Sequence, residues 1–138
     1  MKYQKKCIIC NKIFETNYFK TSTCSNKCRT ILGNQRTSEK KIEKWLESGN
    51  INLGNNSRVK GCYRKYIQDE QNNKCAICGI SDVWNNKRIV FVLDHIDGHS
   101  SNNNRNNLRL VCPNCDSQLD TYKSKNKKSD RDYRKYMK

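Results

Sequence analysis

The sequence contains few apolar residues and no long apolar run. Apolar residues make up 34% of the 138 positions, and the longest uninterrupted aliphatic or aromatic run is only Ile89 to Leu93. A membrane-spanning helix needs about 20 consecutive apolar residues, and a secretory signal needs an apolar stretch near the amino terminus. We therefore expect a cytoplasmic protein that is neither exported nor membrane-spanning.

The low apolar content also limits the core that the chain can build. With 30% charged residues, the sequence predicts one ordinary domain or two very small ones, without a large single core. Nine cysteines offer another source of stability, because eight of them form four close pairs: Cys7-x2-Cys10, Cys24-x3-Cys28, Cys75-x2-Cys78 and Cys112-x2-Cys115. Two such pairs fit around one tetrahedral zinc ion, and a reducing cytoplasm disfavours disulfides. We expect two structural zinc ions, with Cys62 left over as a small buried apolar residue.

Acidic residues are scarce, and the excess of positive charge is unevenly distributed. The chain has 13 acidic and 28 basic residues and a net charge of +15. Residues 1–44 carry 11 basic and 3 acidic side chains and residues 119–138 carry 8 and 3, whereas residues 76–118 carry 4 of each. Basic flanks of this kind, including a basic tail at 129–138 that we expect to be flexible unless bound, favour binding to phosphates. The alternative is a basic surface that only aids solubility.

The first half of the sequence predicts a small finger followed by a helical linker. Residues 1–35 contain two cysteine pairs and too few apolar residues to fold without metal. Within the linker, 36–71, apolar residues at helical spacing predict a helix at 38–47, with Ile42, Trp45 and Leu46 on one face, and a second helix at 58–70. Gly49 is expected to end the first helix, and turn formers predict a loop at 51–57. The basic face of the second helix is either solvated or in contact with DNA backbone.

The second half predicts two strands and a helix held by zinc, in a domain spanning 72–128. Residues 87–95 are rich in strand formers, and 108–111 is the expected partner strand. Glycine and asparagines predict a long loop between them, and 116–126 is expected to be helical. Cys75 and Cys78 precede the strand pair and Cys112 and Cys115 follow it, so one zinc ion with no open coordination position would clamp its ends.

The motif LDHIDG, followed by NNLRLVCPNCDSQ, resembles the signature of the HNH endonucleases. The resemblance covers roughly residues 72–126 and includes the lead-in KYIQDEQNNKCAICG. It implies an α+β fold: a small zinc-stabilised ββα-metal nuclease domain, here preceded by helices and an amino-terminal zinc finger.

The resemblance also implies catalytic roles for individual residues. Asp94 would bind the catalytic metal, His95 would be the general base and Asn107 would brace the loop. The final ligand is usually histidine but is Asp116 in this sequence, and a pair of carboxylates suits Mg²⁺ or Mn²⁺. Alternatively, Asp116 is only the N-cap of the following helix. Consecutive strand residues point to opposite faces, so Asp94 and His95 share a site only if the strand ends or twists there.

Other polar residues near the motif have less specific expectations. His99, Arg105 and Arg109 are either phosphate contacts or solvated side chains. Asn102 and Asn103 are expected to cap or cross-link the loop.

The amino-terminal finger resembles, through Cys24-Ser-Asn-Lys-Cys28-Arg and the Phe14 region, small treble-clef-like modules found ahead of such nuclease domains. Basic residues surround its cysteines and suggest DNA docking, although a purely structural finger is the alternative: Lys5, Lys6, Lys12, Lys20, Lys27 and Arg29.

The sequence thus predicts a metal-dependent HNH DNA endonuclease, a free-standing phage or mobile-element enzyme related to homing nucleases. It would act in the host cytoplasm if a phage encodes it. One active site cuts one strand, so double-strand cleavage would need a homodimer or two binding events. The alternatives are a zinc-stabilised DNA-binding or regulatory protein with an inactive nuclease site and, with less support, an enzyme acting on RNA.

Overall fold

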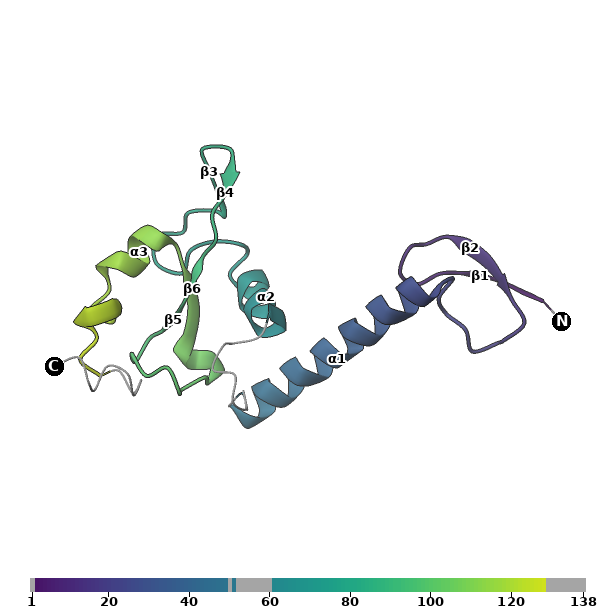
Figure 1. The fold of residues 1–138 in the computed structure, drawn as a ribbon, viewed down its shortest axis with the longest axis horizontal. Helices are drawn as coiled ribbons and strands as arrows, with labels where there is room; N and C mark the ends of the chain where they lie inside the picture. Colours follow the sequence, from purple (N-terminus) through teal and green to yellow (C-terminus); the bar gives the residue numbers. More distant parts are fainter. Residues whose placement is uncertain (1, 50, 52–60, 129–138) are drawn as a thin grey trace. The chain divides into compact units, whose positions relative to one another are not determined.

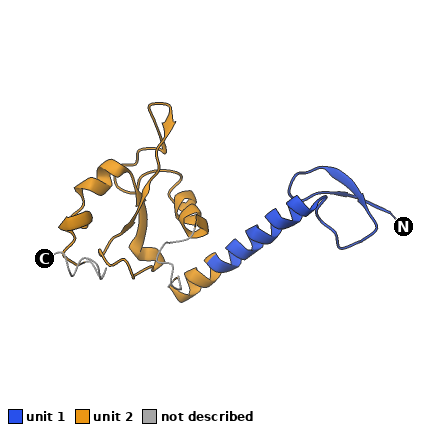
Figure 2. Ribbon diagram, in the orientation of Figure 1, with its two compact units in different colours: residues 1–41 blue, residues 42–138 orange. Residues whose placement is uncertain are grey.

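The computed structural model describes residues 2–49, 51 and 61–128 (Figure 1). It divides into two compact units, residues 1–41 and 42–138, each of which carries one group of four cysteines (Figure 2). Most of the predicted loop at 51–57, the start of the second predicted helix and the basic tail lie outside the described residues.

The first unit begins with a small antiparallel hairpin. Strands β1 (Tyr3–Lys6) and β2 (Ile13–Thr16) pair with Tyr3 opposite Thr16 and Lys6 opposite Ile13. The turn between them carries the first cysteine pair, and the second pair leads into helix α1 (Asn26–Ser48). The hairpin and the helix start thus bring the two pairs together.

Helix α1 begins 12 residues before the predicted start at residue 38, so that boundary was wrong. Ser25 Oγ accepts a hydrogen bond from the amide of Cys28 at 3.3 Å, and this contact satisfies one of the amides that a helix start leaves unpaired. Gly49 ends the helix as predicted, with φ of 69° and its amide 2.9 Å from the carbonyl of Trp45. Among the described helices, none is long and apolar enough to cross a bilayer.

The second unit combines short helices and strands around one core. Its elements after α1 are α2 (Gly61–Glu70), β3 (Val83–Trp84), β4 (Lys87–Arg88), β5 (Val92–His95), η1 (Arg105–Asn107), β6 (Leu108–Val111), α3 (Pro113–Gln118) and η2 (Lys123–Lys125). The strands pair as β3 with β4 and β5 with β6, both antiparallel. Figure 1 shows β5 and β6 at the centre of this unit.

The predicted strand at 87–95 is two strands in the structure. Residues 87–88 pair with β3, whereas 92–95 pair with β6 in a register that places Val92 opposite Val111 and His95 opposite Leu108. Between them the Arg64 guanidinium donates a hydrogen bond to the carbonyl of Phe91. The prediction of one continuous strand was wrong, but the predicted partner strand 108–111 is confirmed.

The helix predicted at 116–126 is also shifted. Helix α3 begins at Pro113, a residue whose fixed φ suits the first helical position, and its N-cap is Cys112. It ends at Gln118, and Leu119 is already extended. Asp116 therefore lies inside the helix and is not its cap.

The core of the second unit is formed by residues of helices α1, α2 and α3, of the central strands and of the cysteine group. Its most deeply buried side chains are Trp45, Ile67, Leu108, Leu110 and Val111. The indole of Trp45 packs edge-to-face on the rings of Tyr63 and Tyr66, with ring centroids 5.2 and 6.0 Å apart. Cys75, Cys112 and Cys115 belong to the same cluster, and Cys62 packs against it half-buried. Leu46, expected on the buried face of α1, is exposed.

Candidate functional site

The eight paired cysteines form two metal-binding groups. In each group the four sulfur atoms lie within 4.8 Å of one another: Cys7, Cys10, Cys24 and Cys28, and Cys75, Cys78, Cys112 and Cys115. The Sγ–Sγ separations of Cys10–Cys24, Cys24–Cys28 and Cys78–Cys112 are 3.5, 3.8 and 3.7 Å. Sulfurs at about 2.3 Å from a tetrahedral zinc ion are about 3.8 Å apart, whereas disulfide sulfurs are about 2.05 Å apart. The predicted grouping is confirmed, and each group can hold a zinc-like ion.

The first cysteine pair of each group lies in a backbone turn of the same kind. Asn11 and Gly79 each lie four residues after the first cysteine of their group, and both have positive φ, 60° and 72°. Their amides donate hydrogen bonds to the carbonyls of Cys7 and Cys75 at 2.9 and 3.0 Å. The left-handed conformation explains why asparagine and glycine stand at these positions.

Within each group the pKa of one thiol is lowered and that of another is raised. The amide of Cys10, ahead of other hydrogen bonds, lowers the pKa of Cys7 to about 6. Burial disfavours the thiolate of Cys75, but backbone amides outweigh it and lower the pKa to about 6. A hydrogen bond with Cys10 raises the pKa of Cys24 to about 12, and burial raises that of Cys115 to about 12. A bound cation would stabilise all four thiolates together, so that all four thiols are deprotonated.

A separate cavity of about 210 Å³ lies beside β5 and α3. All four residues of β5 line it, together with Asp116 from α3 and Tyr122 and Lys123 from the segment that follows. The cavity therefore brings Asp94, His95 and Asp116 together on one surface. Asp94 and His95 are the last two residues of β5.

Asp94 is nearly buried and paired with a cation. Its side chain is 6% exposed, and Arg109 lies directly opposite on β6, with Nε 2.7 Å from Asp94 Oδ2. The guanidinium neutralises a carboxylate that would otherwise be costly to bury. Arg109, expected to contact phosphate or solvent, instead holds one oxygen of Asp94.

His95 is oriented by Asn103. His95 Nε2 lies 3.0 Å from Asn103 Oδ1, and Asn103 Nδ2 donates to the carbonyl of Ser101 at 3.3 Å. Because Oδ1 only accepts, the imidazole nitrogen facing it carries the proton, and Nδ1 is left as a proton acceptor. Asn103 is 5% exposed, and its carbonyl accepts the indole N–H of Trp45 at 2.9 Å. The core therefore fixes the residue that orients His95.

Asp116 is held in a site that disfavours its negative charge. Burial raises the pKa of the Asp116 carboxyl, the charge of Asp94 raises it further, and Lys123 acts in the opposite direction. Within the described residues, only the cysteine groups bring three or more ligand atoms within 4.8 Å. Asp94, His95 and Asp116 therefore do not bring three ligand atoms within 4.8 Å of one another.

The loop between β5 and β6 is organised by Asp97, a residue that sequence reasoning did not select. Its Oδ1 accepts the amide of His99 at 2.9 Å and Asn107 Nδ2 at 2.8 Å, and its Oδ2 accepts Asn102 Nδ2 at 2.6 Å. Burial opposes ionisation, but these bonds lower the pKa of Asp97. Asn107 also accepts the Asp97 amide at 3.0 Å and donates to the Asn102 carbonyl at 2.8 Å. Asn107 thus ties the two ends of the loop together.

Several basic residues considered as DNA contacts are engaged within the protein. Arg105 Nε is 2.6 Å from Glu70 Oε2, and its guanidinium also donates to the Leu108 carbonyl at 2.7 Å. On α2, Lys65 pairs with Asp69. In the finger Lys5 is half-buried, whereas the other basic residues predicted to surround the cysteines are exposed: Lys6, Lys12, Lys20, Lys27 and Arg29.

The architecture is that of a small α+β metal-binding protein with two groups of four cysteines. Over 54 residues, 39% of the chain, its sequence is 43% identical to the H-N-H endonuclease F-TflIV of Escherichia phage T5. The matched stretch is 23% of the phage protein, so the chain covers less than a quarter of that relative's length. No family model and no solved structure match the chain. The similarity supports an HNH-type nuclease relationship for this part of the chain.

Proposed function

We propose that the chain is a metal-dependent DNA endonuclease of the HNH type that hydrolyses phosphodiester bonds. The observation that carries this proposal is the cavity that Asp94, His95 and Asp116 line together. The order β5, β6, α3 around it supports the finer assignment of a ββα-metal nuclease fold, and the 43% identity to a phage H-N-H endonuclease supports the reaction class.

In this proposal His95 is the general base. Asn103 Oδ1 accepts a hydrogen bond from the protonated Nε2 of His95, so Nδ1 is available to remove a proton from the attacking water. Asn107, through Asp97, keeps the loop that carries Asn103 in place, which makes both asparagines positioning residues.

Asp94 and Asp116 would hold the divalent ion. Burial and then the charge of Asp94 raise the pKa of Asp116, and a cation placed between the two carboxylates would relieve their repulsion. When bound, Mg²⁺ or Mn²⁺ supplies charge stabilisation for the phosphate and the leaving oxygen. Arg109 pairs with Oδ2 of Asp94, so the other carboxylate oxygen would be the one to bind the ion.

DNA is the proposed partner because the net charge is +15 and the exposed basic residues of the finger provide phosphate contacts. A phage or mobile-element enzyme, with DNA docking by the finger, fits these features. Double-strand cleavage would require a homodimer or two successive binding events.

A plasmid assay tests the proposal. Wild-type protein with Mg²⁺ or Mn²⁺ should convert supercoiled plasmid to the nicked form, and His95→Ala should reduce the rate at least about 100-fold, as expected for loss of a general base. His99→Ala is the matched control, because this second histidine lies in the loop that follows β5, and its backbone amide, which hydrogen-bonds Asp97, is kept by the substitution. Equal loss of activity in both variants would refute the role of His95.

The engagement of Asp94 by Arg109, together with aspartate in place of the usual histidine at position 116, favours a second candidate function. This candidate is a zinc-stabilised DNA-binding or regulatory protein without nuclease activity. Binding of DNA by both wild type and His95→Ala, with no cleavage by either under any divalent ion, would select it.

A further inference from the structure

A short hairpin of the second unit exposes a tryptophan and two basic residues. Strands β3 and β4 form it, and Figure 1 shows that it projects from the rest of the unit. All four strand residues are exposed: 66% of Trp84 and 55% of Val83 are accessible to solvent. The other tryptophan, Trp45, is 1% exposed and lies in the core. The side chain of Trp84 is therefore not required by the packing of the unit.

The hairpin has a defined conformation despite its small size. Asn85 and Asn86 connect the strands with φ of 50° and 56°, the pair of left-handed residues that a type I′ turn requires. At its base the amide of Ile89 donates to the carbonyl of Asp82 at 2.7 Å, and the amide of Asp82 donates to that of Asn73 at 3.0 Å. The exposed residues are thus presented on a preorganised support, which reduces the entropic cost of binding.

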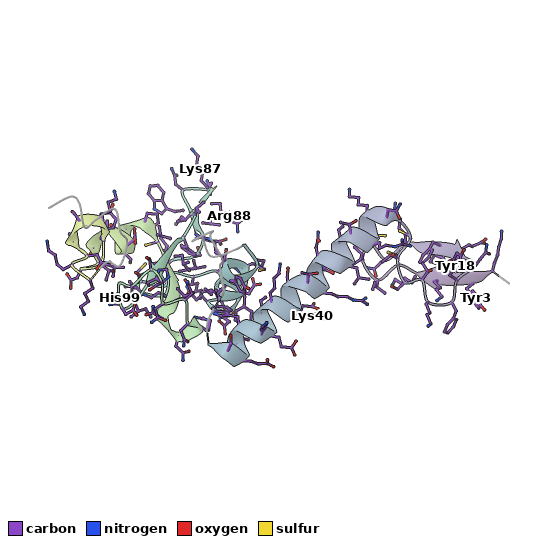
Figure 3. All side chains as sticks on the ribbon, turned by 60° about the horizontal axis from the view of Figure 1, so that its bottom comes forward. Tyr3, Tyr18, Lys40, Lys87, Arg88 and His99 are labelled. Atoms are coloured by element: carbon purple, nitrogen blue, oxygen red, sulfur yellow. The ribbon has the colours of Figure 1, made fainter. Side chains whose placement is uncertain are left out.

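The register places an aromatic ring beside a free cation. Trp84 lies opposite Lys87, so their side chains share one face, and Val83 and Arg88 share the other. Arg88 Nε is 3.6 Å from Asp82 Oδ2, whereas Lys87 makes no ion pair within the described part of the chain. Figure 3 shows Lys87 and Arg88 extending from the hairpin into solvent.

We propose that this hairpin is a DNA-binding element, in which the indole of Trp84 stacks on a base and the ammonium of Lys87 binds a phosphate. Proteins bind nucleic acids by combining exposed aromatic rings, on which bases stack, with neighbouring cations that bind phosphates. The proposal rests on DNA as the partner in the proposed function, but it does not depend on cleavage.

Binding of a fluorescently labelled synthetic single strand, measured by anisotropy without added Mg²⁺ or Mn²⁺, tests this assignment. Trp84→Leu keeps an apolar side chain but removes the ring, and it should raise Kd roughly tenfold or more, whereas Trp84→Phe should retain most of the affinity. Lys87→Gln should reduce the slope of log K against log salt by about 0.7. Leu46→Ala, at an exposed apolar position on α1, is the control and should bind as wild type.

Fluorescence quenching gives a direct readout in the unmodified protein. Acrylamide should quench Trp84 and spare Trp45, and bound DNA should protect Trp84. Quenching unchanged by bound DNA, or wild-type affinity in Trp84→Leu, would overturn the hairpin assignment even if plasmid is nicked. A Trp84 effect on binding without nicking would support the hairpin and refute the nuclease. Failure of wild type to bind DNA would refute both, and a dimer lost in Trp84→Leu with unchanged DNA affinity would identify a second copy as the occupant.

Discussion

Replacing Asn103 by aspartate tests how the candidate base is held. Asn103 Oδ1 is 3.0 Å from His95 Nε2, and the asparagine is 5% exposed. Asn103→Asp keeps the shape and an accepting oxygen at this position but adds a negative charge beside the imidazole. The added charge stabilises the imidazolium, which cannot act as a base.

The expected magnitude follows from the geometry. Two unit charges at 3.0 Å attract by about 5 kcal/mol at an effective dielectric constant of about 20. Desolvation of a carboxylate at this buried position cancels much of that attraction. We therefore expect the acidic limb of the pH–rate profile to move about 1 to 2 pH units upward, with a plateau rate close to wild type at high pH.

The assay is the initial rate of plasmid nicking as a function of pH. Asn103→Ala should instead lower the plateau at least about tenfold, because the imidazole loses its orientation. Asn106→Asp adds the same charge at an exposed position of the same loop and should leave the limb in place. An unmoved limb in Asn103→Asp together with full activity in Asn103→Ala would refute the assignment of Nδ1 as the proton acceptor.

Two further predictions concern the metal-binding residues. Metal analysis should find two zinc ions per chain, and Cys112→Ser should lose one of them with a marked fall in the unfolding temperature; a single zinc in wild type would contradict one of the two groups. Asp116→Asn should raise the unfolding temperature in buffer without Mg²⁺ while abolishing nicking, because burial and Asp94 disfavour the ionised carboxyl in the folded state. Since the folded-state pKa is raised, this destabilisation grows as pH rises through the carboxyl range, so the variant's advantage should vanish at acidic pH. An advantage that is equal at all pH values would exclude charge as its cause.

Local sequence signals located most elements but missed boundaries that depend on distant contacts. Apolar spacing correctly placed Ile42 and Trp45 against the core, but it gave no sign that α1 starts at Asn26, where the sequence has few apolar residues. At the break before β5 the Phe91 carbonyl accepts a hydrogen bond from Arg64, which is far from it in sequence. By contrast, Pro113 was a local signal for the start of α3 that could have been used.

The candidate site shows the same division. The cysteine groups follow from spacing, because a tetrahedral ion needs four ligands and the chain offers them in close pairs. The partners of the candidate catalytic residues do not. Arg109 reaches Asp94 only through the register of β5 and β6, and Asn103 reaches His95 only through a loop organised by Asp97. The aspartate within the asparagine-rich loop, Asp97, is a sequence signal for the hydrogen bonds that organise this loop.

Hydrogen bonds and strand pairing connect the second cysteine group to the candidate site. The Cys112 amide donates to Cys75 Sγ at 3.2 Å, and the side chain of Gln71 both accepts the Leu110 amide and donates to its carbonyl, each at 2.8 Å. These bonds fix β6, and β6 in turn sets Arg109 opposite Asp94. A chain with so few apolar residues thus uses a metal-binding group as part of its core, and the same group holds the strand that neutralises a buried carboxylate. The second cysteine group and Asp94 are therefore connected through β6.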